Sequence, residues 1–364
     1  MPQDPSLTPN LSRPDLILPE WPLFGFADDA RPALRAAMEA GKPAALATIV
    51  ALGDGGPRPV GTQMVLADEI ASGFLSGGCL ESDVAGHALA CLADGESRRL
   101  VYGDGSPWPD IRLLCGARIE ILLERILPDD AAARTLLELE RARVPAKWIS
   151  DGARRACGPA DSPMQPWQGA FSRRHDPVLR LVVLGSDPTA LAIATLGGQA
   201  GCETTLVRPK GPVAPPALPG FAYSREEPAQ ALADIGLDPW TAVAVATHEA
   251  ELDHAALTVA LPSPAFYVGA LGARRRVADR KAALKAAGVS DRDVERLHAP
   301  IGLDIGGKAP WEVAVAVLGE ITALRYALVS GSTSTGSPAA AAEAPTGRRI
   351  SASASANTVT SDES

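Results

Sequence analysis

Residues 179–207 read LRLVVLGSDPTALAIATLGGQAGCETTLV, and this stretch decides the fold of the second half of the chain. The apolar run LRLVVLG has the length of a strand and ends in a glycine. Small and apolar residues then recur at helical spacing up to GGQAG, and a second apolar run, ETTLV, follows. Strand, tight turn, helix and strand in this order are typical of the first unit of a parallel α/β sheet.

The same alternation continues downstream. Apolar runs of strand length at 241–247 and 265–271 alternate with helical patterns. A last helix is predicted from Pro310, a favourable first helical residue, to about Ala327. We therefore expect the α/β fold class, with a Rossmann-like parallel-sheet domain over residues 178–330.

The first half of the chain carries a different α/β pattern. A helical pattern follows Asp28 and Asp29, and strand-like runs at 44–52 and 62–66 are separated by a turn rich in Gly and Pro. A helix is predicted over 82–92, and further strands and a helix follow. The expected organisation is an N-terminal extension at 1–27, a first α/β domain at 28–160, a linker at 161–177, the Rossmann-like domain at 178–330 and a disordered tail at 331–364.

Composition limits the classes of function. The chain has 364 residues, a hydrophobic fraction of 46% and a net charge of −9, so we expect two globular domains and no field that attracts nucleic acid. The N-terminus lacks the pattern of a signal peptide, and no apolar run reaches the roughly 18 residues of a membrane span. The five cysteines form no C-x-x-C pair and are expected to be free thiols. We therefore expect a cytoplasmic protein with no membrane partner.

The segment LSGGCLE at 75–81 is a candidate for chemistry in the first half. It joins an apolar run to a helix, where backbone N–H groups can converge on an anion. Gly77 and Gly78 permit close approach of the backbone to a ligand, and the helix dipole favours the thiolate of Cys79. This combination indicates cofactor or sulfur chemistry. The alternative, to which the pattern gives about equal weight, is a tight turn with a buried thiol.

Cys115 is a second loop cysteine that we expect to lie near the first. Together with His87 the two cysteines invite comparison with a zinc site, but their spacing matches no common metal-binding pattern. His87 is expected to pack on its helix. We therefore predict no metal site.

The turn after the first strand of the Rossmann-like domain departs from the dinucleotide-binding pattern G-x-G-x-x-G/A. Gly185 occupies the position of the first glycine, but Asp187 replaces the middle one, where a carboxylate would repel a pyrophosphate. Arg208 stands at the end of the second strand, where an acidic residue usually holds a ribose. It favours a phosphate or no nucleotide at all, so ordinary NAD binding is not expected.

Three further loops of this domain carry candidate residues. His248 follows a core strand, at the sheet edge where ligands of open α/β sheets bind. Arg274 begins a run of three arginines at a helix start, which is either an anion cradle or a solvated helix end. Asp304 lies in a glycine-rich loop that begins at His298 and is elaborate for a mere connector. His254 is expected to be an exposed, structural residue.

Several motifs in order carry a resemblance to a known family. They are SGGCLE, a later CG, THEAELD, YVGALGARRR and HAPIGLDIGGKAPWEVAVAVLGEI. In this order they resemble the xanthine dehydrogenase accessory protein family (XdhC/CoxI), from about residue 30 to residue 328, which implies an XdhC/CoxI-type α/β domain at 28–160. The departures from the family pattern are Ser186 and Asp187 in place of a glycine-rich turn, Arg208 in place of an acidic residue and Ala117 in place of a second glycine.

The resemblance implies a cytoplasmic chaperone and not an enzyme. Members of the family bind molybdenum cofactor, keep it sulfurated and deliver it to a molybdenum hydroxylase such as xanthine dehydrogenase or an aldehyde oxidoreductase. The cofactor is molybdopterin, either as such or as its cytosine dinucleotide. Expected partners also include a cysteine desulfurase and a second copy of the chain in a homodimer. The hypothesis that follows places the cofactor against Gly77, Gly78, Cys79, Glu81, Cys115, Gly185, His248, Arg274 and Asp304.

Two other functions stay open at this point. The first is an oxidoreductase that uses NAD(P) with His248 as acid or base, for which the Rossmann-like pattern is the only support. The second is a scaffold that docks a molybdoenzyme without touching its cofactor, in which case Cys79 would have no role in delivery.

Overall fold

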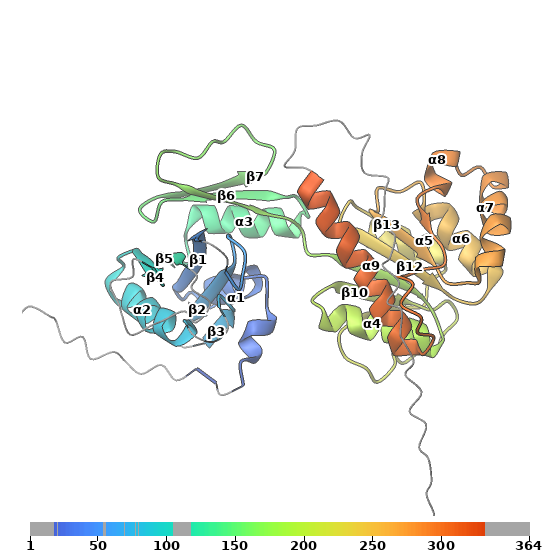
Figure 1. Cartoon of the computed structure of the whole chain (residues 1–364), viewed down its shortest axis with the longest axis horizontal. Coiled ribbons are helices and arrows are strands. Elements are labelled where there is room, and N and C mark those ends of the chain that lie inside the picture. The colour runs from blue at the N-terminus through green and yellow to red at the C-terminus, as the bar shows by residue number, and fades with distance from the viewer. Residues whose placement is uncertain are drawn as a thin grey trace, which may run out of the picture.

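The structure, a computed structural model, describes residues 18–19, 21–53, 56–68, 70–76, 78, 80–104 and 118–331. Most of the expected N-terminal extension, the residues Gly77, Cys79 and Cys115, and the tail beyond residue 331 lie outside the described residues. Figure 1 shows two bodies side by side, with the N-terminal elements in one and the C-terminal elements in the other.

The first body is built on a five-stranded antiparallel sheet with the order β3-β2-β1-β5-β4. Its strands are β1 (Ala44–Leu52), β2 (Gln63–Ala67), β3 (Ile70–Gly73), β4 (Arg98–Tyr102) and β5 (Ile119–Ile126). Side chains of β1 alternate between two cores: Ala45 and Ala47 face the core of α2 (Glu81–Asp94), and Leu46 faces that of α1 (Arg31–Glu39) and α3 (Ala131–Arg141). The expected helices and strands of this half are confirmed.

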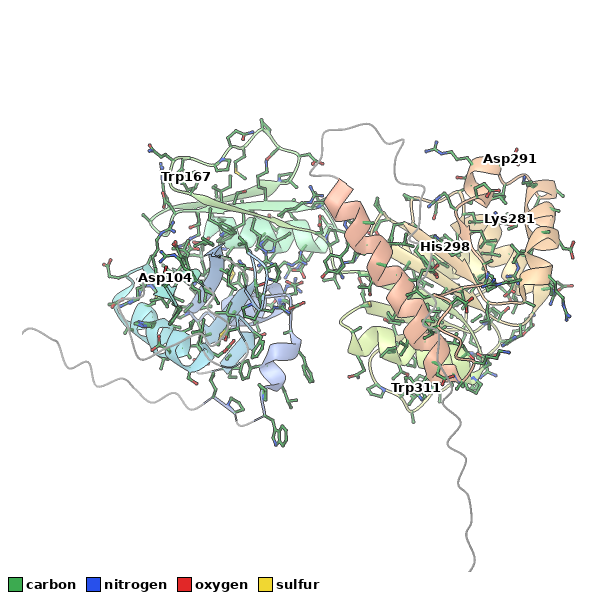
Figure 2. All side chains as sticks on the ribbon, viewed as in Figure 1. Asp104, Trp167, Lys281, Asp291, His298 and Trp311 are labelled. Atoms are coloured by element: carbon green, nitrogen blue, oxygen red, sulfur yellow. The ribbon has the colours of Figure 1, made fainter. Side chains whose placement is uncertain are left out.

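A small antiparallel sheet completes the first body. β6 (Ala146–Ser150) and β7 (Arg155–Pro159) form a hairpin, and β8 (Phe171–His175) pairs with the other edge of β6. β8 lies within the stretch expected to be a linker. The connection before it is also packed, since Trp167 donates its indole N–H to Asp151 (Figure 2). Only residues 176–179 separate β8 from the next strand.

The second body is the expected Rossmann-like domain. Its six strands run parallel in the order β11-β10-β9-β12-β13-β14. They are β9 (Arg180–Gly185), β10 (Glu203–Val207), β11 (Ala222–Ser224), β12 (Thr241–Ala246), β13 (Tyr267–Ala270) and β14 (Leu297–His298). Consecutive residues along the central strands are buried, so both faces of the sheet are covered. Helices cover it from both sides.

Two groups of helices form these layers. α4 (Pro188–Gln199) and α9 (Pro310–Gly331) pack on one face together with Leu181 and Val183 of β9. The other face buries Val182 and Leu184 against α5 (Pro228–Ile235), α6 (Ala250–Ala260), α7 (Val277–Ala286) and α8 (Asp291–Val294). Among the described residues, none of the helices has the length and apolar character that a membrane span requires.

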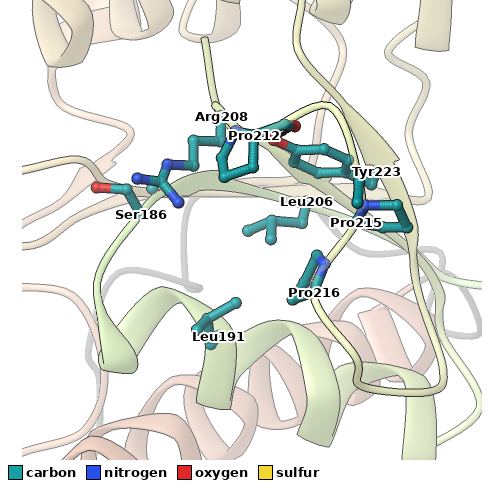
Figure 3. Close-up of a pocket in the computed structure, with 10 residues that line it drawn as sticks. Ser186, Leu191, Leu206, Arg208, Pro212, Pro215, Pro216 and Tyr223 are labelled. Atoms are coloured by element: carbon teal, nitrogen blue, oxygen red, sulfur yellow. Dashed lines mark hydrogen bonds between the residues drawn. The ribbon is translucent and has the colours of Figure 1, made fainter. Parts of the chain in front are cut away.

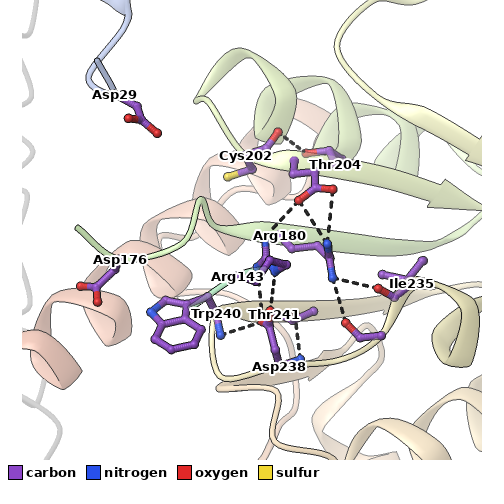
Figure 4. A network of polar contacts seen from close by, with 12 residues as sticks. Asp29, Arg143, Asp176, Arg180, Cys202, Thr204, Ile235, Asp238, Trp240 and Thr241 are labelled. Atoms are coloured by element: carbon purple, nitrogen blue, oxygen red, sulfur yellow. Dashed lines mark hydrogen bonds and ion pairs between the residues drawn. The ribbon is translucent and has the colours of Figure 1, made fainter. Parts of the chain in front are cut away.

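Arg143 connects the two bodies. It follows α3 of the first body, and its guanidinium binds the carboxylate of Asp238 in the second body and, at 3.0 Å, that of Glu203 (Figure 4). Burial alone would raise the pKa of Asp238, but its hydrogen bonds from Arg143 and Thr241 bring that pKa below the usual value. On the opposite side of the joint, Arg31 donates to the carbonyl of Asp176 at 2.9 Å.

Replacing Arg143 by alanine should weaken this joint. Arg143→Ala leaves Asp238 without its cation, whereas Glu203 keeps its pair with Arg180, and we expect a loss of about 1–3 kcal/mol in the free energy of unfolding. Urea unfolding followed by circular dichroism measures it, and limited proteolysis should show faster cleavage within 176–179. The control is Arg141→Ala, because Arg141 and its partner Glu39 are 61% and 64% exposed. Equal stability of the two variants would refute a structural role of the joint.

Candidate functional site

The loop before α2 is organised by a buried carboxylate. Oε1 of Glu81 accepts the N–H groups of Leu75 at 3.0 Å and Ser76 at 2.7 Å. Oε2 accepts the hydroxyl of Ser76 at 2.8 Å and the N–H of Leu80 at 3.2 Å. Glu81 is only 2% exposed. Its carboxylate therefore satisfies backbone groups of the loop that precedes α2, whereas Leu80, the N-cap of that helix, provides no side-chain cap.

Gly78 forms the exposed part of the same loop. It has a φ of 97°, in the region that favours glycine, and an added Cβ would meet no heavy atom within 4 Å. The loop is therefore open toward solvent at this residue. Gly77, Cys79 and Cys115 lie outside the described residues, so their place in the site stays a prediction.

The described cysteines do not have the environment of reactive thiols. Burial is the main cause that raises the pKa of Cys91, Cys157 and Cys202, and for Cys157 it raises the pKa to about 12. Because the thiolate is the nucleophile and the metal ligand, these three thiols are poorly suited to either task. Within the described part of the chain, no three or more His, Cys, Asp or Glu side chains converge to hold a metal ion.

The turn after β9 joins the turn after β12. Asp187 is the N-cap of α4, where its Oδ1 accepts the N–H of Ala190 at 2.8 Å, and its Oδ2 lies 2.8 Å from Nε2 of His248. Burial alone would raise the pKa of Asp187, but these two hydrogen bonds bring it below the usual value. The replacement of the middle glycine thus has a structural reason, because the carboxylate satisfies the helix start that a pyrophosphate would otherwise bind.

Close packing around position 185 requires a glycine there. An added Cβ would clash with the carbonyl oxygen of Ala246 and lie 2.6 Å from Cβ of Ala190. The absence of a side chain lets β9, β12 and α4 approach one another closely at the sheet edge. His248 has a φ of 61°, which is uncommon for a residue other than glycine and holds its ring at the edge.

A second carboxylate, missed in the sequence, holds the same edge. Asp253 on α6 is 5% exposed, and it accepts hydrogen bonds from the hydroxyl of Thr247 at 2.6 Å and from Arg280 at 2.7 Å. Arg280 also donates to the carbonyl of Leu271 at 3.0 Å. The sequence does contain a signal for this residue. Asp253 stands three positions before Ala256 and four before Leu257, which places it on the apolar face of its helix.

Glu320 of α9 organises the loop that begins at His298, and it too was missed. Its carboxylate lies 3.1 Å from Nδ1 of His298 and accepts the hydroxyl of Tyr267 at 2.6 Å and the N–H of Gly302 at 2.9 Å. The rings of His298 and Tyr267 stack with centroids 4.7 Å apart. His298 and the start of this loop are therefore bound to the body of the domain. Burial alone would raise the pKa of Glu320, but the hydrogen bonds from His298 and Tyr267 bring it below its usual value.

The structure brings the predicted residues together in pairs and not as one site. Arg274 pairs with Asp304 at 2.7 Å, and both side chains are 76% exposed. Among the described residues, no hydrogen bond or ion pair connects this pair with His248, or either of them with Gly78 and Glu81. Figure 1 shows α2 on the side of the first body that faces away from the second. His254, expected to be exposed, is half-buried.

Comparison with known proteins finds relatives that match about four-fifths of this chain. Residues 181–321 match the XdhC Rossmann domain, and residues 37–103 match the XdhC and CoxI family. The molybdenum cofactor insertion chaperone PaoD of Escherichia coli is 31% identical over 303 residues, which are 82% of this chain and 89% of PaoD. A Bacillus subtilis protein named as a probable subunit of xanthine dehydrogenase is 25% identical, over 80% of this chain and 96% of that protein.

A solved structure has the same fold. The crystal structure of a protein described as a xanthine dehydrogenase from Bacillus halodurans superposes with a TM-score of 0.65. It is 21% identical in sequence, and the match covers 83% of this chain and 96% of that one. The order of the two bodies, and not only the Rossmann-like half, therefore recurs in an experimental structure.

The anchoring role of Glu81 is open to a direct test. In Glu81→Gln the amide nitrogen must face backbone N–H donors, which leaves buried groups unsatisfied, so we expect a loss of about 1–3 kcal/mol in the free energy of unfolding. Thermal and urea unfolding measure this change. Glu96→Gln, at an exposed position just after the end of the same helix, is the matched control. A variant at position 81 that unfolds like the wild type would show that the carboxylate does not support the loop.

Proposed function

The chain belongs to the XdhC and CoxI family, and we propose on this basis that it is an accessory chaperone for molybdenum cofactor. In this proposal it binds the cofactor in the cytoplasm, protects the sulfurated form and delivers it to a molybdenum hydroxylase of the xanthine dehydrogenase type. It acts as a maturation factor and not as a catalyst. A cysteine desulfurase that renews the sulfur is the second partner in this proposal.

One observation carries the proposal. Glu81 is buried and fully hydrogen-bonded, and it shapes a loop whose next residues toward the N-terminus include the exposed Gly78 and the thiol-bearing Cys79. Gly78 is exposed, and Cys79 follows it in the sequence, so a ligand bound at this residue has a thiol next to it along the chain. The similarity to PaoD, whose name describes molybdenum cofactor insertion, supports the same function.

The donor set fits the cofactor. Cys79 would offer a soft thiolate to the sulfur-ligated molybdenum, and the free space above Gly78 leaves room for the pterin. The exposed guanidinium of Arg274 is suited to a phosphate. When bound, the cofactor supplies the redox-active molybdenum that a client enzyme needs, whether in its monophosphate or its cytosine dinucleotide form. The chain itself would bind it and exclude water.

The separation of the candidate residues supports a homodimer. Gly78 belongs to the first body, whereas His248 and Arg274 lie in the second, and among the described residues no hydrogen bond or ion pair connects these loops. If residues of both bodies contact one cofactor, a second copy of the chain would supply one set. Light scattering of the purified protein, with and without cofactor, measures whether a dimer forms.

The geometry gives less support to an NAD(P)-dependent oxidoreductase. The N–H of Ala190, one of the groups that a dinucleotide pyrophosphate would use, is already bonded to the carboxylate of Asp187. The adjacent negative charge opposes a second anion there. His248 is bound to the same carboxylate, so it would enter catalysis only after that contact is broken.

We expect Cys79→Ala to bind molybdenum cofactor at least about 10-fold more weakly than the wild type, because one strong ligand contact is worth about 1.4 kcal/mol or more. Anaerobic titration with ultraviolet-visible spectra and metal analysis measures this difference. The matched control is Cys91→Ala, because Cys91 lies buried in α2 and its thiol is desolvated. This variant should bind like the wild type.

Three outcomes separate the proposals. Selective loss in Cys79→Ala locates the site at the loop. Cofactor binding that both variants retain at wild-type strength moves the site to the second body. If the wild type binds no cofactor but still forms a complex with an apo molybdenum hydroxylase, the chain is a docking scaffold and the chaperone proposal is wrong.

A further inference from the structure

A cavity of about 290 Å³ opens beside the turn between β9 and α4, and Gly185 is the one residue of its lining that is also among those predicted from the sequence to contact the cofactor. Leu191 of α4 and Leu206 of β10 form its floor, and Pro212 and Pro216 belong to the segment that closes it (Figure 3). Arg208, at the end of β10, is the one charged residue of its lining. The cavity is thus an apolar slot with a single cation at its rim.

The walls of this cavity are fixed by specific contacts. The hydroxyl of Tyr223 donates to the carbonyl of Pro212 at 3.0 Å, which holds the proline-rich segment above the sheet. Gly198 of α4 packs directly on the backbone of Gly220, where any side chain would clash. The segment is therefore fastened at both ends, to β11 and to α4, and the slot is part of the fold.

The guanidinium of Arg208 makes no hydrogen bond or ion pair within the described part of the chain, although the backbone N–H and carbonyl of this residue are both bonded. The nearby acids are engaged elsewhere, since Asp187 holds His248 and Glu227 lies 3.9 Å from Lys210. Figure 3 shows the side chain of Arg208 extended toward Ser186. A half-buried cation without a counter-ion favours an anionic ligand.

The geometry points to a binding site for one phosphorylated nucleoside, in the second body and separate from the proposed cofactor loop at Gly78. The phosphate lies on the guanidinium of Arg208, and the base lies between Leu191, the prolines and the ring of Tyr223. The volume is near the lower end of the range of about 300–1,000 Å³ for ligand sites, so it accommodates one nucleotide and not a dinucleotide. Because Asp187 occupies the start of α4, the charge of the ligand is recognised at Arg208.

Calorimetric titration of the cofactor-free full chain with 5′-CMP, 5′-AMP and 2′-AMP tests this site, with adenosine and inorganic phosphate as fragments. We expect at least one nucleotide to bind with a dissociation constant below about 1 mM and more tightly than either fragment. Preference for 2′-AMP indicates the phosphorylated end of a larger cofactor, and preference for a 5′-nucleotide indicates a free mononucleotide. Each preference supports the site.

Two charge-matched variants locate the contact. Arg208→Met and Lys210→Met each remove one positive charge from the same segment with little change in side-chain length, but Lys210 is exposed and does not line the cavity. We expect Arg208→Met to weaken nucleotide binding about 10-fold or more, and Lys210→Met to change it less than about 2-fold. Thermal unfolding of both variants checks that they are folded.

Three results would overturn the inference. The first is that no nucleotide binds at millimolar concentration, and the second is that adenosine binds as tightly as its phosphates. The third is that Arg208→Met and Lys210→Met weaken nucleotide binding equally. None of them bears on molybdenum cofactor binding at the loop of Gly78, which is measured with a different ligand and different variants.

Discussion

The ligand-facing edge of the parallel sheet depends on one buried carboxylate, that of Asp253. It bonds the hydroxyl of Thr247 after β12 and the guanidinium of Arg280 in α7, and Arg280 in turn holds the carbonyl of Leu271 after β13. Two turns and two helices are thereby fixed by a single side chain. A buried carboxylate is stable only while its charge-assisted partners remain, so these contacts are mutually dependent. His248 stands on the edge that this network holds.

The same principle recurs in both bodies. Glu81 satisfies the loop before α2, Asp187 satisfies the start of α4, and Glu320 satisfies the loop after His298. In each case the protein supplies its own anion to backbone N–H groups that would otherwise attract one. The positions left to attract a ligand are then those that none of these carboxylates satisfies. Among the described residues, two such positions are Gly78, where an added Cβ would meet no heavy atom within 4 Å, and Arg208, whose guanidinium makes no ion pair.

The sequence predicts the framework of this fold better than it predicts the site. The strands β9 and β12 and helix α4 follow from uninterrupted apolar runs and helical spacing, which are local signals. β11 has three residues after a proline-rich stretch, and β8 carries charged residues between prolines, so loop signals outweigh strand signals in both. The partners of Asp253 and Glu320 are 27 and 53 residues away at their most distant, and no local pattern specifies such pairs. The family motifs point to particular loops, whose part in binding stays a prediction, whereas the contacts that hold those loops are tertiary.

The joint between the two bodies limits how a ligand can meet both. β8 pairs with β6 along its whole length, four residues lead from its end to β9, and Arg143 binds Asp238 and Glu203 across the joint. A short connection with an ion-paired side chain leaves little freedom for one body to turn toward the other. Gly78 and His248 belong to different bodies, and among the described residues no hydrogen bond or ion pair connects their loops. If the joint preserves this separation, a ligand that contacts both loops is shared between two copies of the chain. The architecture of the joint thus links the extent of the cofactor site to the oligomeric state.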